Sequence, residues 1–569
     1  MKDPRCSKKA RIDCCIESHD SNERFEDMVT SITLKQNTSI KDISNYKYLS
    51  ILNLFDTKVD SITSCPVLHN LNITENAELK CLSLSSIQEF NINYASKVHT
   101  IDLESAHIVY INKLPVLKVL NLPNVHILNI SNVNIHRNVL SFKPMAKLKI
   151  LRLDNIVGME GQDAIWRNNI DRLYINNCDI VTLSNVEGYR ELVIRNCSQL
   201  QKVDSISRID NIVIENCSSL KTIENCSDII TMNISKCNKF NDVSDIDLES
   251  LNIEYCFGLL HLESILVETL DVGFCPRIQN INVNPEMKYL VISNCSMLDS
   301  LLFECNSAFC YSTLKISLIG DNMIENIDEW YVSSLTVSDN RCLERISNIY
   351  NLTELSLVDC YELVTLSDTF IVDSLYTSNC PILESITNVY GYHNLDIIGC
   401  QDLIEMDVNH SKLLSLTIQE CPQLNLHVNG QFLEQLTLID TGFITIKDLD
   451  VAANIRTLRA TMLPDLCSKP NRVGSLYNEA TKKLINHMGR LFKSTKVIVD
   501  RIRMYSFRSK YLKFIEMRDS NRISDCVICQ ENISFDNMVI TSCDHMYHSE
   551  CINMWMRTKR VCPLCNYSL

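Results

Sequence analysis

Residues 192–220 read LVIRNCSQLQKVDSISRIDNIVIENCSSL and contain two copies of one pattern. The first copy is Leu192-Val-Ile194 followed by Cys197, and the second is Ile212-Val-Ile214 followed by Cys217, 20 residues further on. Alternating apolar positions of this kind are typical of a short β-strand with one buried face. A fixed period near 20 residues predicts a repeat array, because one such unit cannot bury its own apolar edge.

The same unit extends in both directions from this stretch. It reads Leu-x-Leu/Ile/Val-x-x-Cys/Asn-x-x-Leu-x-x-Ile and recurs every 19 to 21 residues from about Val29 to residue 460. Roughly twenty repeats fit at this period. Between Cys295 and Leu335 the frame is interrupted, which predicts an inserted loop at 303–310. The frame elsewhere is marked by a column of cysteines: Cys178, Cys197, Cys217, Cys237, Cys256, Cys275, Cys295, Cys360, Cys380, Cys400 and Cys421.

This unit resembles the leucine-rich repeat family. The resemblance implies an α/β-type repeat solenoid of short parallel strands with few helices on its convex side. A period of 20 residues leaves little room for a full helix there, so we expect extended or short 3₁₀ segments. In the family, an asparagine at the cysteine position bonds the backbone of neighbouring coils, and a small buried thiol can do the same more weakly. A metal role for the cysteine column is disfavoured, because one thiol per coil forms no tetrahedral group.

The residues that flank the second apolar position of each unit face away from the predicted core. They are mixed polar and aromatic side chains, as on protein-binding surfaces, and they form neither a basic stripe nor a catalytic constellation. The hypothesis is that this concave face binds a protein substrate, and the alternative is a solvated face that binds nothing. The candidate substrate-binding residues are Tyr174, Arg195, Glu254, Tyr376 and Asp396.

The end of the chain carries a second pattern, built from potential metal ligands. Two cysteines separated by two residues can supply two corners of a tetrahedral zinc site from one tight turn. Eight ligands predict two closed sites, which are structural because no coordination position stays open. The ligands are Cys526, Cys529, Cys543, His545, His548, Cys551, Cys562 and Cys565, separated by 2, 13, 1, 2, 2, 10 and 2 residues.

This order of three Cys, two His and three Cys resembles the RING-H2 variant of the RING finger. The family's cross-braced arrangement implies one zinc on Cys526, Cys529, His548 and Cys551, and a second zinc on Cys543, His545, Cys562 and Cys565. A PHD finger is disfavoured, because it uses one His and places a Trp two residues before its seventh ligand. Here Trp555 lies seven residues before Cys562.

The resemblance implies an E3 ubiquitin ligase, which holds a ubiquitin-charged E2 enzyme against a substrate and forms no covalent intermediate itself. Such a protein contributes proximity and orientation. By family position, Ile528, Trp555 and Pro563 would form a shallow apolar groove for the E2. Asn566 occupies a position where many active RING fingers carry Arg or Lys. Because Asn has no charge, we expect lower intrinsic activity, or dependence on the choice of E2 or on dimerisation.

A basic segment separates the repeats from the finger. From Arg472 to Arg518 there are 12 Lys or Arg against 3 Asp or Glu, and from Ser475 the apolar spacing is helical. Three hypotheses stay open for it. It is a helical connector that caps the solenoid or pairs with a second copy, it binds nucleic acid through 471–520, or it attracts an acidic membrane surface.

Composition limits the class of protein. The chain has 569 residues, a net charge of -15, 46% hydrophobic residues and 22% charged residues, which is typical of a folded multidomain protein. No run of eighteen apolar residues predicts a membrane span, and the N-terminal MKDPRCSKKARIDCC has no apolar core of a signal peptide. Of 27 cysteines, six belong to the finger and need free thiolates. These features favour a reducing intracellular location, the cytoplasm before the nucleus.

We therefore predict a polar leader at 1–28, a leucine-rich repeat solenoid at 29–460, a basic helical linker at 461–520 and a RING-H2 finger at 521–569. The predicted function is that of a RING-type E3 ubiquitin ligase with two Zn²⁺, whose partners are an E2 enzyme, ubiquitin and a protein substrate on the repeats. The alternatives are a non-enzymatic repeat scaffold with a structural zinc finger, and a regulator that binds nucleic acid through the linker.

Overall fold

The computed structural model divides the chain into two compact units, Met1–Leu363 and Val364–Leu569, and each is described by itself. The residues that the structure describes are 13–17, 29–36, 39–63, 65–134, 141–142, 145–158, 170–263, 265–304, 311, 313–349, 352–406, 412–429, 432–447, 457–460, 526–529, 538–540, 545–556, 559 and 561–565.

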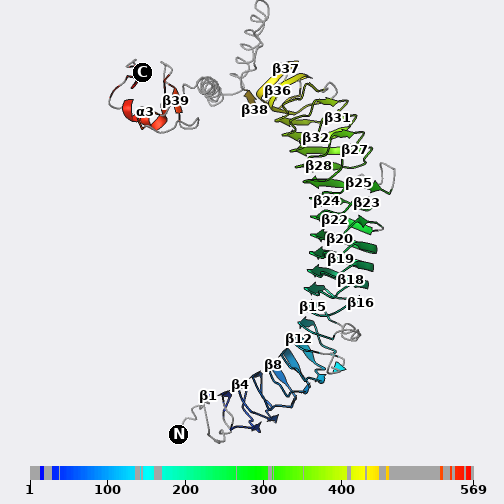
Figure 1. The fold of residues 1–569 in the computed structure, drawn as a ribbon, viewed down its shortest axis with the longest axis vertical. Coiled ribbons are helices and arrows are strands. Elements are labelled where there is room, and N and C mark those ends of the chain that lie inside the picture. Colours follow the sequence, from blue (N-terminus) through cyan, green and yellow to red (C-terminus); the bar gives the residue numbers. More distant parts are fainter. Residues whose placement is uncertain are drawn as a thin grey trace, which may run out of the picture. The chain divides into compact units, whose positions relative to one another are not determined.

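The first unit is organised around a ladder of parallel strands, here called the principal ladder, in which strands follow in sequence order (Figure 1). Each strand buries alternate apolar residues, as the period-2 pattern predicts. In β17, for example, Leu192 and Ile194 are fully buried. The strands are β1 (Asp13–Glu17), β2 (Ser31–Lys35), β4 (Ile51–Phe55), β6 (Asn70–Thr74), β8 (Ile87–Asn93), β10 (Ala106–Asn112), β12 (Val125–Ser131), β14 (Ile150–Asp154), β15 (Arg172–Asn176), β17 (Glu191–Arg195), β18 (Lys202–Glu215), β19 (Thr222–Ser235), β20 (Asp242–Glu254), β22 (Ile265–Gly273), β24 (Tyr289–Ser293), β26 (Lys315–Ile319), β28 (Ser334–Ser338) and β30 (Leu352–Val358).

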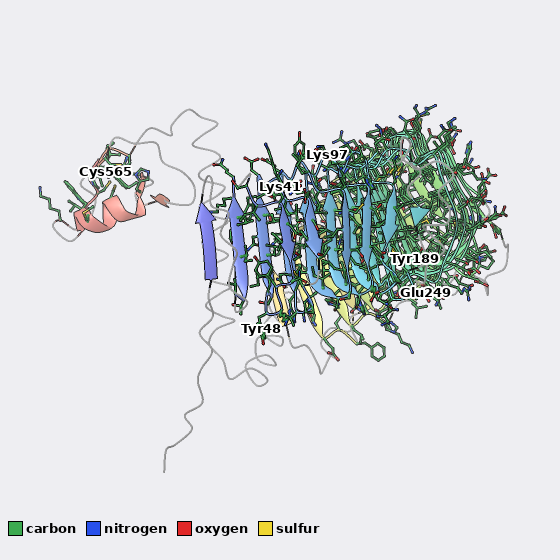
Figure 2. The ribbon with its side chains drawn as sticks, turned by 90° about the horizontal axis from the view of Figure 1, so that it is seen from below. Lys41, Tyr48, Lys97, Tyr189, Glu249 and Cys565 are labelled. Atoms are coloured by element: carbon green, nitrogen blue, oxygen red, sulfur yellow. The ribbon has the colours of Figure 1, made fainter. Side chains whose placement is uncertain are left out.

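Shorter parallel strands form the return side of these coils. This confirms the expected extended segments, and no helix occurs among the described residues of the repeats. The strands are β3 (Asp42–Ser44), β5 (Ser61–Thr63), β7 (Cys81–Leu84), β9 (Thr100–Leu103), β11 (Val119–Asn121), β13 (Ser141–Phe142), β16 (Thr182–Glu187), β21 (His261–Leu262), β23 (Asn280–Val283), β25 (Ser300–Phe303), β27 (Asn326–Asp328) and β29 (Arg345–Ser347). In Figure 2, Lys41 and Lys97 lie at one edge of the coils and Tyr48 lies at the other.

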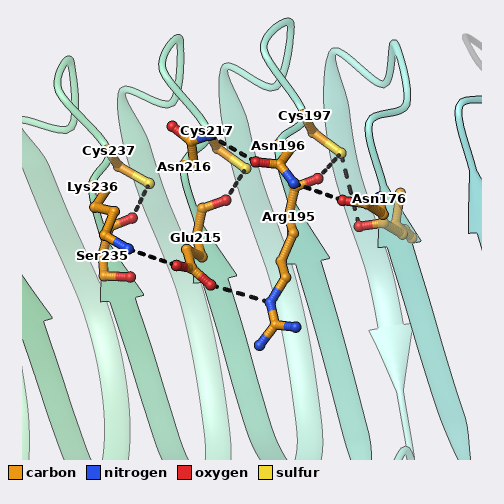
Figure 3. Close-up of polar contacts among 11 residues, drawn as sticks. Asn176, Arg195, Asn196, Cys197, Glu215, Asn216, Cys217, Ser235, Lys236 and Cys237 are labelled. Carbon is orange, nitrogen blue, oxygen red and sulfur yellow. Dashed lines mark hydrogen bonds and ion pairs between the residues drawn. The ribbon is translucent and has the colours of Figure 1, made fainter.

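A corner with left-handed backbone follows the strands of the principal ladder. Asn196 and Asn216, which directly follow β17 and β18, have φ of 54° and 56°. Asparagine tolerates this conformation better than most residues. Nδ2 of Asn216 donates to Oδ1 of Asn196, and Nδ2 of Asn196 donates to Oδ1 of Asn176, so amides connect successive coils (Figure 3).

The cysteine column lies immediately after these corners, inside the coils. Cys197 and Cys217 are fully buried. The Cys197 thiol donates to the carbonyl of Arg195 at 3.3 Å in its own coil, and only at 4.0 Å to that of Ile175 in the coil before (Figure 3). The prediction of a buried column is confirmed. The stronger cross-coil bonds come instead from the asparagine one position earlier.

The second unit contains further coils of the same kind. Its principal strands are again parallel, and Cys380, Cys400 and Cys421 are fully buried in it. The principal strands are β32 (Ile371–Ser378), β34 (Asn394–Ile398), β36 (Ser415–Asn429), β37 (Gln435–Lys447) and β38 (Thr457–Ala460), and the return strands are β31 (Thr365–Ser367), β33 (Ser385–Thr387) and β35 (Glu405–Met406).

The finger is small and differs from the coils. It has an antiparallel pair, β39 (Met538–Ile540) and β40 (Met546–His548), followed directly by helix α3 (Ser549–Met556). Figure 2 shows Cys565 in the finger beside this helix. The helix after the central ligands is therefore present as expected.

Two expectations about the repeats need correction. β1 pairs with β2 in register, so the coils begin within the segment that we expected to be a polar leader. The frame between Cys295 and Leu335 is not broken, because Lys315 of β26 is the direct partner of Tyr289 of β24. The extra residues lengthen one coil and leave the ladder intact, although 305–310 themselves lie outside the described residues.

The linker predicted at 461–520 also lies outside the described residues, and with it the hypotheses for 471–520. Among the residues that are described, no helix is both long enough and apolar enough to cross a membrane.

Candidate functional site

Four of the predicted ligands form one cluster in the finger. The ligand atoms of Cys526, Cys529, His548 and Cys551 all lie within 4.8 Å of one another. Nδ1 of His548 is 3.1 Å from Sγ of Cys529 and 3.9 Å from Sγ of Cys551. The turn at 526–529 supplies two ligands, the end of β40 supplies His548, and the first turns of α3 supply Cys551. These are the four residues that the family resemblance assigns to one zinc.

A second cluster holds His545, Cys562 and Cys565, with ligand atoms again within 4.8 Å of one another. Nδ1 of His545 is 3.6 Å from Sγ of Cys562. Cys543, the fourth ligand expected here, lies outside the described residues. His545 and His548 sit at opposite ends of the three-residue strand β40, so the short central run of ligands contributes to both clusters.

The donor sets and spacings suit zinc. With Zn–S near 2.3 Å and Zn–N near 2.0–2.1 Å, a tetrahedral site places sulfur and nitrogen about 3.6 Å apart. The distances of 3.1, 3.6 and 3.9 Å from histidine nitrogen to cysteine sulfur are spread around that value. Cys526 and Cys562 are fully buried, whereas Cys529 and Cys565 are exposed. Thiolate and imidazole at this separation are ligands that zinc prefers.

Two aromatic residues tie the second cluster to the rest of the finger. The hydroxyl of Tyr547, which is fully buried, lies 2.9 Å from Sγ of Cys562 and accepts a hydrogen bond from the backbone N–H of Leu564. Nε1 of Trp555 donates to the carbonyl of Val561 at 2.9 Å, which attaches α3 to the segment before Cys562. Tyr547 was not among the predicted site residues. Its place between the two central histidines was the available signal, because buried groups next to a ligand often orient it.

The three residues predicted to contact an E2 are half-buried, and each has an exposed apolar neighbour. Ile528, Trp555 and Pro563 keep part of their surface accessible. The exposed neighbours are Val527 at 44%, Met554 at 64% and Leu564 at 52%. Sequence reasoning missed these three neighbours, which widen the accessible apolar surface of the finger. Asn566 lies outside the described residues.

Comparison with known families gives the class of this region. Residues 524–566 match the ring finger domain family. Together with the order of its ligands and the two clusters, the match shows that the chain carries a RING finger domain of the RING-H2 type.

Relatives with curated functions share this domain. The chain is 41% identical over 56 residues to the transmembrane E3 ubiquitin-protein ligase FLY1 of Arabidopsis thaliana, which covers 9% of this chain and 10% of the relative. It is 45% identical over 42 residues to the E3 ubiquitin ligase BIG BROTHER-related of the same plant, covering 7% and 12%. It is 45% identical over 40 residues to the E3 ubiquitin-protein ligase DZIP3 of Mus musculus, covering 7% and 3%. The chain thus spans about a tenth of the length of these relatives or less, and the likeness is confined to the finger.

The coils carry no comparable match. The solved TLR13–ssRNA13 complex covers 71% of this chain and 83% of its own chain, at 14% identity and a TM-score of 0.21. A score this low supports no inference, so the repeats are interpreted from their own contacts.

The candidate substrate residues of the first unit lie on the outward face of the principal ladder. Tyr174 on β15 donates from its hydroxyl to the Glu191 carboxylate at 2.5 Å, and the guanidinium of Arg152 lies 4.8 Å from its ring centre. Burial and the Glu191 carboxylate raise the pKa of Tyr174. Tyr174 is therefore occupied by neighbouring coils.

Arg195 is likewise engaged within the array. Its Nε lies 3.2 Å from the carboxylate of Glu215 in the next coil, and Nζ of Lys236 reaches the same carboxylate at 2.9 Å (Figure 3). Glu254, at the end of β20, forms no ion pair among the described residues.

In the second unit, the structure brings two of the candidates together. Tyr376 of β32 and Asp396 of β34 are direct partners across neighbouring strands, and both are half-buried. Whether any of these residues binds a substrate stays a prediction.

Proposed function

We propose that this protein is a RING-type E3 ubiquitin ligase. The observation that supports this most is the pair of cysteine–histidine clusters inside a RING finger domain, flanked by accessible apolar side chains. The relatives that share the domain are E3 ubiquitin ligases by name.

The metal would have a structural role. Cys526, Cys529, His548 and Cys551 would hold one zinc, and His545, Cys562 and Cys565 would hold a second together with Cys543. Closed tetrahedral zinc of this kind contributes folding free energy and leaves no position for a reacting water. The two ions would hold the turn at 526–529 and the segment around Pro563 beside helix α3.

The finger would then act by docking. Ile528, Trp555 and Pro563, extended by the exposed neighbours Val527, Met554 and Leu564, would form the apolar contact for an E2. In such a reaction the thioester carbonyl is attacked by a substrate lysine amine, and the E2 cysteine leaves as the thiol. The ligase supplies proximity and orientation and no nucleophile.

The coils would recruit the substrate on the outward face of the principal ladder, because solenoids offer long surfaces that bind proteins. We place this activity in a reducing intracellular compartment, the cytoplasm before the nucleus. The finger needs thiolates to bind metal.

The test is a ubiquitination assay with zinc-loaded full-length protein, E1, ubiquitin and a panel of E2 enzymes. We expect polyubiquitin chains with at least one E2. Absence of chains with every E2, while both zinc ions are bound, would favour a non-enzymatic repeat scaffold with a structural finger.

A further inference from the structure

One place on the first unit departs from the rule that governs the coil corners. The residues that follow β20 and β22 are Tyr255 and Phe274, with φ of 54° and 52°. Bulky side chains are rare in this left-handed conformation, and a strained backbone of this kind is often found where function requires it. The equivalent corner residues Asn196, Asn216 and Asn294 are the type expected.

The two aromatic side chains lie side by side and remain accessible. Their rings stack with centres 4.7 Å apart and planes 4° from parallel. Tyr255 is 38% exposed and Phe274 is 42% exposed, although burial would normally be the benefit of placing such groups. The chain therefore presents an aromatic surface at positions where asparagine would form the corner with less strain.

Unpaired acceptors lie next to these rings. Corner side chains reach back to the last strand residue of the preceding coil, as Lys236 does to Glu215 and Asn196 does to Asn176 (Figure 3). By the same offset, Phe274 lies beside Glu254. Glu254 is equivalent to Glu215 in its coil.

The two glutamates differ in their partners. Glu215 binds both Arg195 and Lys236, whereas Glu254 has no lysine or arginine within ion-pair distance among the described residues. The residue across the ladder from Glu254 is Gly273, which has no side chain to cover the carboxylate. Glu254 is thus left available to a cation from outside.

Two further acceptors complete the group. Asp271 on β22 is the direct partner of Asn252 on β20, two positions before Glu254 on that strand. The side-chain oxygen of Asn252 is buried without a hydrogen-bond partner in the part of the chain that is described. Three acceptors on two adjacent strands, with no donor among the described residues, lie next to an exposed aromatic pair.

We propose that this surface, formed by Asn252, Glu254, Tyr255, Asp271 and Phe274, binds an arginine side chain of a partner protein. A guanidinium is planar, carries five donors in a fixed fork and stacks on aromatic rings. A lysine ammonium is a more strongly hydrated point charge and matches the aromatic pair less well. As a substrate contact the surface depends on the proposed ligase function, but arginine binding itself does not.

The test uses full-length protein and a fluorescein-labelled peptide, acetyl-(Gly-Arg-Gly-Ser)₃-amide, with fluorescence anisotropy at physiological salt. The same peptide with lysine in place of arginine serves as the competitor class. The key variant is Tyr255→Asn with Phe274→Asn, which restores the common corner residue and should fold at least as well. Glu254→Gln removes only the charge. Matched controls are Tyr94→Asn, an exposed aromatic with positive φ at another corner, and Glu215→Gln, a carboxylate already paired.

We expect the arginine peptide to bind more tightly than the lysine peptide. Either key variant should weaken it at least about fivefold, and the controls should change it less than about twofold. The inference is overturned if wild-type protein shows no binding, if lysine binds as tightly as arginine, or if the controls weaken binding as much as the key variants. Trp555→Ala should abolish ubiquitin transfer and leave peptide binding unchanged, so failure of the ligase and failure of this surface are distinguishable.

Discussion

The amide of Asn216 donates to the side-chain oxygen of Asn196 across 2.7 Å, one repeat apart (Figure 3). Both residues also have positive φ at the end of their strands. One residue type therefore performs two tasks in these coils, because it accepts the left-handed corner and links successive coils through its side chain.

Replacing this residue should separate the two tasks. Asn196→Ala loses the amide bond and places Cβ in the left-handed conformation, so we expect it to lower the free energy of unfolding by about 1–2 kcal/mol. Asn196→Gly loses the bond but accepts the backbone, and its loss should be smaller. Urea unfolding of the two variants checks the order. An alanine variant as stable as wild type would show that the corner imposes no left-handed requirement.

The cysteine column should be chemically inert. Burial raises the pKa of Cys178 to about 12 and that of Cys226 to about 11, which keeps both thiols protonated and unreactive at neutral pH. Cys81 is exposed and should react first. Iodoacetamide labelling of native protein, mapped by peptide mass spectrometry, tests this, with urea-unfolded protein as the control in which all three react. Native labelling of Cys178 at the rate of Cys81 would contradict the buried column.

Asp271 should make stability depend on pH in a defined direction. Burial, and then the Glu254 carboxylate, raise the pKa of Asp271 above its ordinary 3.8. The folded state therefore holds this proton more tightly than the unfolded state, and it loses stability as the pH rises through the interval above 3.8. Asp271→Asn has no charge to lose. It should have a higher Tm than wild type at pH 7 and the same Tm near pH 3, as thermal unfolding at the two pH values would show. A lower Tm at pH 7 would mean that the carboxylate is needed inside the fold.

Trp555 should be needed for E2 contact and dispensable for metal. Its indole N–H anchors α3 to Val561, but it is no ligand. Trp555→Ala should keep both zinc ions and lower the rate of chain formation about thirtyfold or more, as expected for a buried contact of a small interface. Ile528→Ala should act in the same direction. Zinc content and chain-formation rate, measured on the same samples, are the readouts. Full activity with several E2 enzymes would remove Trp555 from the docking surface.

The architecture of the coils could be predicted because it depends on a local pattern. Alternating residues such as Leu192 and Ile194 determine which face of each strand is buried, and the period determines how coils stack. The role of the corner was missed, because residues as different as Asn196, Lys236 and Tyr255 occupy it. Backbone conformation leaves no residue type there that a single sequence displays.

The site could be predicted only in part, for a related reason. The ligand groups follow from spacing and family resemblance, whereas Tyr547 contacts Cys562 over 15 residues and no spacing rule identifies it. The pairing of Arg195 with Glu215 was accessible in principle, since the two residues are one period apart. Applying the period to charges, and not only to apolar residues, would have found it.

The most direct test of the ligase is single-turnover discharge of ubiquitin from a pre-charged E2 to free lysine, comparing zinc-loaded wild-type protein with His548→Ala. We predict that wild-type protein accelerates discharge and contains two zinc ions per chain, whereas the variant loses bound zinc and the acceleration together. Discharge by wild-type protein at the rate of the E2 alone, with both zinc ions present and across an E2 panel, would contradict the account.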